Sequence, residues 1–118
     1  MSLELSTTTV DDFTVVALAG ELDIYTVSAF RNELEAQDPA SARLVIDLTR
    51  VTLLDSSGLG SLVSMLNRTR EGSGQLGLVC PQRQVRRVFE ITGLRRAFVF
   101  GDDLEGVRAG LAGDSAPA

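Results

Sequence analysis

The segment D-S-S-G-L-G at residues 55–60 holds the residue types in this chain that are most suited to chemistry. It places a carboxylate and two hydroxyls where a helix is expected to begin, and Asp and Ser are preferred caps at that position. Capping accounts for one of these side chains. Gly58 and Gly60 remove side chains from the first turns and open the backbone to close approach. The local chemistry leaves two interpretations open, a helix cap and a functional site.

Several kinds of catalytic site are excluded by residue content. The chain has no histidine, no lysine and no G-x-S-x-G motif, so it can form neither a Ser-His-Asp triad nor the Gly-Lys pair of a P-loop. The run G-L-G-S-L-V ends in Val63, where a dinucleotide fingerprint requires glycine. The single cysteine, Cys80, follows Leu78 and Val79, which indicates a buried small hydrophobe and not a nucleophile. We therefore expect no enzyme of these classes.

Metal sites are restricted in the same way. One cysteine and no histidine cannot supply the usual ligands of zinc, and the acidic residues lack the spacing of a calcium loop. Asp23, Asp47 and Asp55 could still meet near strand ends, although aspartates there more often cap turns or helices. We expect no metal and no cofactor.

Hydrophobic periodicity divides the chain into alternating strands and helices. The clearest helical signal is the i, i+3, i+4, i+7 pattern that begins at Leu59 and ends at Leu66. The dense run 44–48 is typical of a strand buried on both faces, although Asp47 interrupts it. The expected strands are 3–9, 13–19, 44–48, 76–80 and 97–100, and the expected helices span 26–37, the region from the 55–58 turn to Gly72, the stretch around 85–89 that Gly93 ends, and 102–111.

These elements predict an α/β fold in one domain. The first two strands form an N-terminal β-hairpin, and the alternation that follows implies a mixed, largely parallel sheet of about five strands with about four helices packed on it. The length fits a single domain over residues 1–112 followed by a disordered tail at 113–118. The N-terminus lacks the pattern of a signal peptide and no apolar run could span a bilayer, so we expect a cytoplasmic protein with no membrane partner.

The net charge of −5 disfavours direct binding to DNA. All eleven positive residues are arginines, and five of them cluster in one short stretch. Such a cluster is typical of a solvated helix face, with a docking patch for an acidic partner as the alternative. The five are Arg83, Arg86, Arg87, Arg95 and Arg96.

Two landmarks in order carry a resemblance to a known family. The run D-S-S-G-L-G at 55–60 follows L-V-I-D-L and V-T-L-L, and G-E-L-D stands earlier, at 20–23, before a helix. Together they resemble the STAS-domain family of bacterial anti-sigma factor antagonists, and the similarity covers roughly residues 3–111. The resemblance implies the STAS fold and a non-enzymatic role in signalling.

The resemblance also implies a partner switch that controls transcription. The unmodified protein would bind an anti-sigma factor, which is also a serine kinase, and thereby free a sigma factor. Phosphorylation of the first serine of D-S-S-G, here Ser56, would end that binding. A metal-dependent serine phosphatase of the PP2C type would reverse it.

The expected partner-binding residues surround that serine. Helical geometry places three of them along one line of the helix surface, beside the apolar stripe. Two alternatives stay open: Met65 is equally typical of the core, and Asp23 could cap the helix that begins near Thr26. The expected set is Asp23, Asp55, Ser56, Ser57, Gly58, Gly60, Ser61 and Met65.

Two other functions compete with this one. A STAS subunit of a signalling scaffold or transporter complex could share the fold without modification of the serine. A small nucleotide- or anion-binding module could use the helix N-terminus as its anion site.

Overall fold

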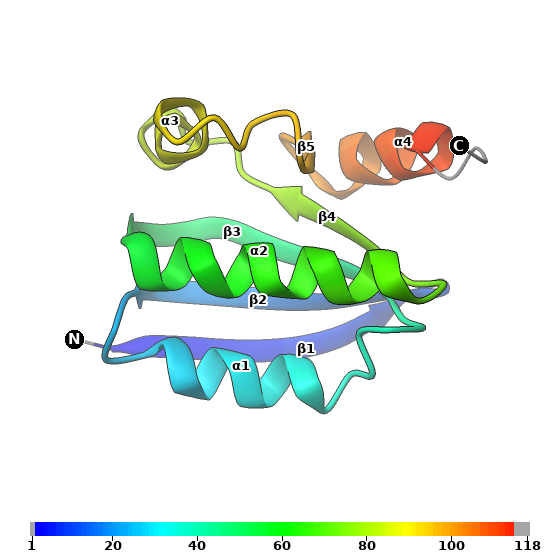
Figure 1. The fold of residues 1–118 in the computed structure, drawn as a ribbon, viewed down its shortest axis with the longest axis horizontal. Coiled ribbons are helices and arrows are strands. Elements are labelled where there is room, and N and C mark those ends of the chain that lie inside the picture. Colours follow the sequence, from blue (N-terminus) through cyan, green and yellow to red (C-terminus); the bar gives the residue numbers. More distant parts are fainter. Residues whose placement is uncertain (1, 115–118) are drawn as a thin grey trace.

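The computed structural model describes residues 2–114. Five strands and four helices alternate along the chain after an N-terminal hairpin, as the sequence predicts (Figure 1). In order they are β1 (Leu3–Val10), β2 (Phe13–Leu22), α1 (Val27–Glu35), β3 (Arg43–Leu54), α2 (Ser56–Glu71), β4 (Gln75–Val79), α3 (Arg83–Ile91), β5 (Val99–Gly101) and α4 (Leu104–Asp114).

The five strands form one mixed sheet in the order β1-β2-β3-β4-β5. β1 and β2 are antiparallel and are joined by a tight turn in which Asp11 adopts a φ of 55°. All the other neighbouring pairs are parallel. Because β2, β3 and β4 are parallel, their carboxyl ends lie at the same end of the sheet, together with the loops that begin α1, α2 and α3.

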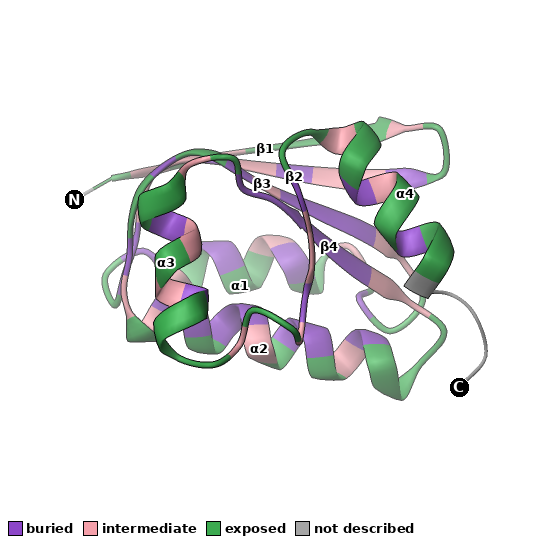
Figure 2. Ribbon diagram, turned by 90° about the horizontal axis from the view of Figure 1, so that it is seen from above, coloured by how far each residue is buried: buried purple, intermediate pink, exposed green. Residues whose placement is uncertain are grey.

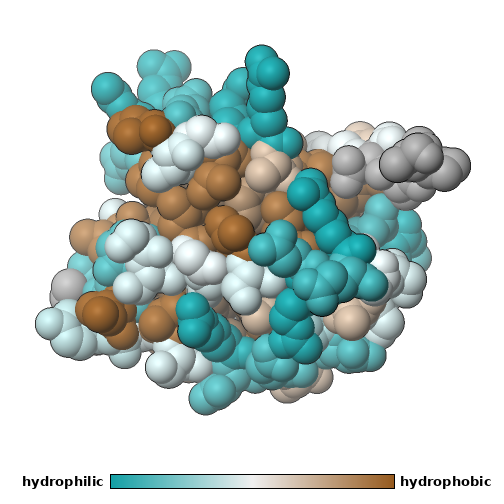
Figure 3. All heavy atoms as spheres, in the orientation of Figure 1, coloured by the Kyte–Doolittle hydropathy of each residue, from teal (hydrophilic) through white to brown (hydrophobic). Residues whose placement is uncertain are grey.

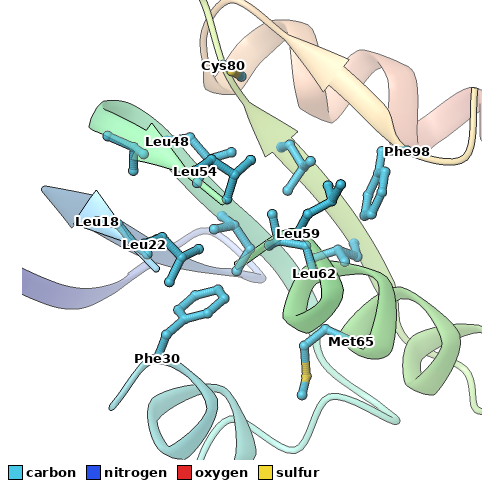
Figure 4. Packing of buried hydrophobic residues seen from close by; sticks show 14 of the residues in the cluster. Leu18, Leu22, Phe30, Leu48, Leu54, Leu59, Leu62, Met65, Cys80 and Phe98 are labelled. Carbon is cyan, nitrogen blue, oxygen red and sulfur yellow. The ribbon is translucent and has the colours of Figure 1, made fainter. Parts of the chain in front are cut away.

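Helices cover the two faces of the sheet unequally (Figure 2). α1, α2 and α3 pack on one face over the larger core, which includes Phe30, Leu62 and Phe89. α4 lies on the opposite face over a smaller cluster that includes Val45 and Leu111. Figure 4 shows Leu59 and Leu62 directed from α2 toward the sheet, in agreement with the helical periodicity of the sequence.

β3 is longer than the sequence predicts, because a bulge after Asp47 lets the strand continue beyond Leu48. The carboxylate of Asp47 accepts hydrogen bonds from the backbone N–H of Thr49 at 3.0 Å and from its hydroxyl. The pairing of β2 with β3 shifts register at this point, since Ala17 lies opposite Asp47 whereas Ala19 lies opposite Arg50. The extra residue of β3 forms a bulge, after which the strand continues to Leu54. The continued strand ends at Leu54, two residues before α2 begins at Ser56.

The C-terminal elements differ from the sequence prediction by a few residues. β5 begins at Val99 and not at Ala97, and α4 spans Leu104–Asp114 in place of 102–111. Gly113 and Asp114, which the sequence assigns to a frayed tail, lie in the last turn of α4, and residues 115–118 lie outside the described part of the chain. None of the described helices has the length and hydrophobicity needed to cross a membrane.

Candidate partner-binding site at the start of α2

The start of α2 lies beside the loop that joins β2 to α1. β2 and β3 are paired up to Leu22 and Leu54, so the two chains leave the sheet next to each other. The backbone N–H of Asp55 donates to the carbonyl of Leu22 at 3.3 Å and keeps them together. The two landmarks of the sequence, G-E-L-D and D-S-S-G-L-G, therefore meet in space.

Asp55 is the side chain that joins these segments. Its Oδ1 accepts hydrogen bonds from the N–H groups of Ser57 at 2.9 Å and Gly58 at 3.0 Å, which makes it the N-cap of α2. Its Oδ2 accepts from the N–H of Ile24, across the loop, at 3.2 Å. One carboxylate thus caps the helix and fixes the β2–α1 loop against it.

Asp23 is only 3% exposed and organises the loop from within. Its Oδ1 accepts hydrogen bonds from the N–H groups of Tyr25 at 2.9 Å and Thr26 at 3.1 Å. The hydroxyl of Thr26 in turn donates to the carbonyl of Glu21 at 2.7 Å. Of the two roles open from the sequence, these bonds favour the structural one, since Asp23 binds the first amides leading into α1.

Ser56 and Ser57 differ in their exposure. Ser56 is exposed at the first position of α2, whereas Ser57 is half-buried. Within residues 2–114, neither hydroxyl makes a hydrogen bond, so neither is needed as a cap. The cap is Asp55, and the exposed hydroxyl of Ser56 is free to react or to bind a partner.

Gly58 and Gly60 have different reasons to be glycine. A Cβ at Gly58 would lie 2.6 Å from the carbonyl oxygen of Leu22 and 2.8 Å from the side chain of Leu54, so packing against the sheet requires glycine there. A Cβ at Gly60 would meet nothing within 4 Å. Glycine inside a helix lowers stability by roughly 0.5–1 kcal/mol relative to alanine. Gly60 therefore carries this disadvantage without any packing requirement in the described chain.

Ser61 does not lie on an accessible line of the helix, and of the two alternatives open for Met65 the structure shows the core one. Ser61 is 0% exposed and its hydroxyl donates to the carbonyl of Gly58 at 2.6 Å. Met65 is 3% exposed and belongs to the main core (Figure 4). Both are covered because α2 packs against α1 as well as against the sheet, so its buried face is wider than one stripe.

The exposed line of α2 instead starts at Ser56 and continues through Gly60, Ser64 and Asn67. These positions are spaced by three or four residues and so share one face. The residues along it are small near the helix N-terminus. A partner can approach the backbone closely at that end.

Exposed apolar residues that the sequence analysis missed lie at the same end of the sheet. Ile24 is 64% exposed, Tyr25 is 79% exposed and Leu53 is 39% exposed. Their signal in the sequence was weak: Ile24 and Tyr25 fall between a strand and a helix, outside both hydrophobic periodicities. Large apolar side chains grouped on a surface are typical of interaction sites. We call the following residues the Ser56 surface: Ile24, Tyr25, Ser56 and Gly60.

Cys80 has no access to this surface. It is fully buried, and that burial raises the pKa of its thiol to about 11. A thiol with so high a pKa is protonated at neutral pH and is a poor nucleophile. Its position in the core agrees with the sequence prediction of a buried hydrophobe.

Comparison with known proteins agrees with the motifs at this site. The family model of the STAS domain matches residues 4–107. The anti-sigma-B factor antagonist of Staphylococcus aureus (strain NCTC 8325 / PS 47) is 35% identical over 96 residues, which cover 80% of this chain and 89% of that protein.

Solved structures share the fold. An anti-sigma factor antagonist from Mycobacterium paratuberculosis is similar with a TM-score of 0.78 and 27% identity, over 94% of this chain and 95% of that one. SpoIIAA of Bacillus is similar in its unphosphorylated form (TM-score 0.74, 24% identity, 93% and 97% of the two chains). Its phosphorylated form is also similar (TM-score 0.67, 23% identity, 92% and 98%). From the family match and the Staphylococcus relative together, this chain belongs to the STAS domain family.

Proposed function

We propose that this protein is a cytoplasmic anti-sigma factor antagonist that binds an anti-sigma factor through the Ser56 surface. The partner is also a serine kinase, it phosphorylates Ser56, and the phosphorylated protein no longer binds. A PP2C-type phosphatase restores the binding form. The observation that carries the proposal is the exposed Ser56 hydroxyl, which lacks a hydrogen bond within the described chain and stands among exposed apolar residues. The naming of the Staphylococcus relative as an anti-sigma-B factor antagonist supports the class of partner.

Ser56 is a better phosphate acceptor than Ser57. A kinase must bring the hydroxyl to its own active site, and Ser56 is exposed at the end of the helix while Ser57 is half-buried. Gly60 lies one turn further along the same face and leaves room for the approaching protein. Exposure and the space around the hydroxyl both favour the first serine of the motif.

A phosphate on Ser56 is compatible with the fold. It adds about −1.5 to −2 charges at pH 7 at the N-terminus of α2. The amides of a helix N-terminus stabilise such a charge by about 0.3–1 kcal/mol, and by about 2 kcal/mol where it is partly buried. This roughly offsets repulsion from Asp55 at a solvent-screened distance. The modified protein therefore stays folded.

The same charge opposes binding. Docking on the Ser56 surface would bury the phosphate beside Ile24 and Tyr25, which offer no positive group. Burying an ionised group without a matching cation costs several kcal/mol, and each 1.4 kcal/mol lowers affinity about tenfold. Phosphorylation thus obstructs the interface directly, with little change in the backbone.

The decisive experiment combines modification with binding. The protein is incubated with ATP and the anti-sigma factor kinases encoded in its genome, and the added phosphate is located by peptide mass spectrometry. We expect one phosphate, on Ser56. Phosphate on Ser57 alone would contradict the assignment.

Binding of variants to the same kinase then tests the switch. Ser56→Ala keeps binding, whereas Ser56→Asp weakens it at least about tenfold because a charge enters the interface. Ser73→Asp is the matched control, since it adds the same charge to an exposed serine beyond the other end of α2. Calorimetry measures all three, and equal affinity of the alanine and aspartate variants at position 56 would refute obstruction.

A further inference from the structure

Three of the five clustered arginines line a pocket that shares no residue with the Ser56 surface. The pocket has a volume of about 200 Å³ and is lined by Arg86 of α3, by Arg95 and Arg96 of the following loop, and by Phe98 and Phe100. A neighbouring hollow shares Arg86 and Arg95 with it. Figure 3 shows a hydrophobic area with hydrophilic groups around it between α2 and the segment that carries α3 and β5. This part of the surface is thus both apolar and charged.

The positive charge of the pocket is only partly neutralised. Arg86 pairs with the exposed Asp102 at 3.3 Å, and Arg95 approaches Glu90 at 3.9 Å. Arg96 forms no ion pair within residues 2–114. Exposed pairs of this kind contribute about 0–1 kcal/mol and are readily exchanged for a better anion. The pocket is basic although the whole chain carries a net charge of −5.

Arg86, which lines both the pocket and the neighbouring hollow, is held in place by its surroundings. Its guanidinium carbon lies 5.4 Å from the centre of the Phe100 ring, in cation–π geometry. Its Nε is buried and has no hydrogen-bond acceptor among the described residues. A buried N–H without an acceptor costs about 1–3 kcal/mol, more where the group is charged. The ring contact and the buried Nε fix the guanidinium, which lines the pocket and can pair with an anion there in place of the exposed Asp102.

The apolar side of the pocket is a fixed aromatic wall. The rings of Phe98 and Phe100 lie 6.3 Å apart, and Phe89 packs edge-on against them at 5.5 Å and 4.9 Å. Because Phe89 is fully buried in the core, this wall cannot easily move. Aromatic rings pack favourably against a planar ring in stacked or edge-on arrangements. The wall suits a flat apolar group next to the charge.

We propose that this pocket binds a small aryl phosphate. The planar ring lies against Phe98 and Phe100, and the phosphate binds Arg86, with Arg95 and Arg96 completing its neutralisation. Arginine suits this role because its planar fork of donors matches phosphate oxygens. The pocket has room for about one ring and one phosphate, which favours a small molecule over an acidic protein segment. The site shares no residue with the Ser56 surface, so it stands or falls independently of the proposed function.

Phenyl phosphate is the probe for the first experiment, a titration of the full chain followed by amide NMR. We expect saturable shifts confined to α3, β5 and the loop between them, with a Kd on the order of 1 mM, typical of a ligand this small. Inorganic phosphate has the anion without the ring, and phenol has the ring without the anion. Each should therefore bind at least about tenfold more weakly than phenyl phosphate. Absence of saturation with phenyl phosphate, or equal binding by inorganic phosphate, would overturn the proposal.

Three variants distinguish binding of phenyl phosphate in the pocket from its nonspecific attraction to surface arginines. Arg86→Gln and Arg96→Gln should each weaken binding of phenyl phosphate at least about fivefold, because each removes a positive group that faces the anion. Arg96 is exposed and unpaired in the described chain, so its variant keeps the fold even if that of Arg86 does not. Arg31→Gln on α1 removes an equally exposed arginine far from the pocket in sequence and should bind as the wild type does. Equal affinity of all three variants would show that the arginines do not form a site.

Discussion

At the scale of single residues, the fold requires only one of the two glycines of D-S-S-G-L-G. Gly58 is required by the fold because a side chain would collide with Leu22 and Leu54. Gly60 faces open space, so the fold gains nothing from it. A helix position that forgoes stability without a packing reason is typical of a surface kept clear for a partner.

Replacing each glycine by alanine tests this distinction. Gly58→Ala should lower the free energy of unfolding by about 1–3 kcal/mol through overpacking. Gly60→Ala should raise it by about 0.5–1 kcal/mol, because alanine favours the helix and meets nothing. Urea denaturation measures both, and a binding assay with the anti-sigma factor should find the more stable Gly60→Ala weakened. Normal partner binding by Gly60→Ala would remove Gly60 from the Ser56 surface.

Cys80 contributes a pH dependence to stability. Burial raises the pKa of its thiol from 9.0 to about 11 in the folded protein. As the pH rises through this interval, the unfolded chain loses the thiol proton first, so the folded state loses stability relative to it. The raised pKa of the thiol stabilises the folded protein by its full amount below about pH 9, and this stabilisation is lost as the pH rises to about 11.

The Cys80→Ala variant isolates this effect. Its free energy of unfolding should fall less than that of the wild type between about pH 8 and about pH 10, with each unit of pKa worth about 1.4 kcal/mol. Urea titrations at both pH values measure the difference. Parallel pH profiles for the two proteins would show that the thiol has an ordinary pKa in the folded state.

At the scale of elements, one side chain adds hydrogen bonds to the apolar packing that holds α3 against the sheet. β3 continues to Leu54, beyond Asp47, the last residue that it pairs with β4. Beyond Asp47, the edge of β3 that faced β4 has no neighbouring strand, so its backbone carbonyl groups need other hydrogen-bond donors. Gln82, the residue before α3, supplies one: its Nε2 donates to the carbonyls of Leu48 at 2.6 Å, Val51 at 2.9 Å and Thr49 at 3.2 Å.

Gln82→Ala should therefore loosen α3 without unfolding the sheet. The lost hydrogen bonds leave partly buried carbonyls unpaired, at a cost of about 1–3 kcal/mol. Hydrogen exchange of the α3 amides should accelerate while that of the α2 amides, which lack this attachment, stays close to the wild type. Gln84→Ala, an exposed position on the same helix, is the control. Equal acceleration in α2 and α3 would indicate general destabilisation in place of a local anchor.

The sequence predicted the type and order of these elements better than their ends. Hydrophobic periodicity was enough for α2, where Leu59, Leu62 and Leu66 all face the core. It missed the end of β3 at Leu54, because the bulge after Asp47 depends on local bonds to Thr49 and on pairing with β2. Such pairing involves residues about thirty positions away and leaves no periodic trace.

At the scale of the whole molecule, Ser56 and the core occupy separate regions. The larger core lies between the sheet and α1, α2 and α3, and the smaller one lies beneath α4. Ser56 belongs to neither and is exposed at one end of the sheet. A charge added there does not enter the packed interior, and the helix N-terminus accommodates it.

Phosphorylation of Ser56 should accordingly leave the architecture unchanged. We expect the phosphorylated and unphosphorylated proteins to unfold within about 4 °C of each other, because the net change in stability at such a site is below about 1 kcal/mol. Calorimetry gives the midpoints, and crystal structures of both forms compare the backbone at 55–66. A displaced α2 would favour a conformational switch over direct obstruction.

The sequence by itself determined the fold class and the family, and its motifs led to the site that we propose at residues 55–60. Hydrophobic periodicity and turn residues are local features, and the motifs G-E-L-D and D-S-S-G-L-G are contiguous. Both can therefore be recognised in the sequence without the three-dimensional structure. Tertiary structure decided which of the site residues a partner can reach. Asp23, Ser61 and Met65 are buried because α1 and the sheet enclose them, whereas Ile24 and Tyr25 are exposed because the loop turns outward. Accessibility depends on which elements pack together, and that is settled only when the chain folds.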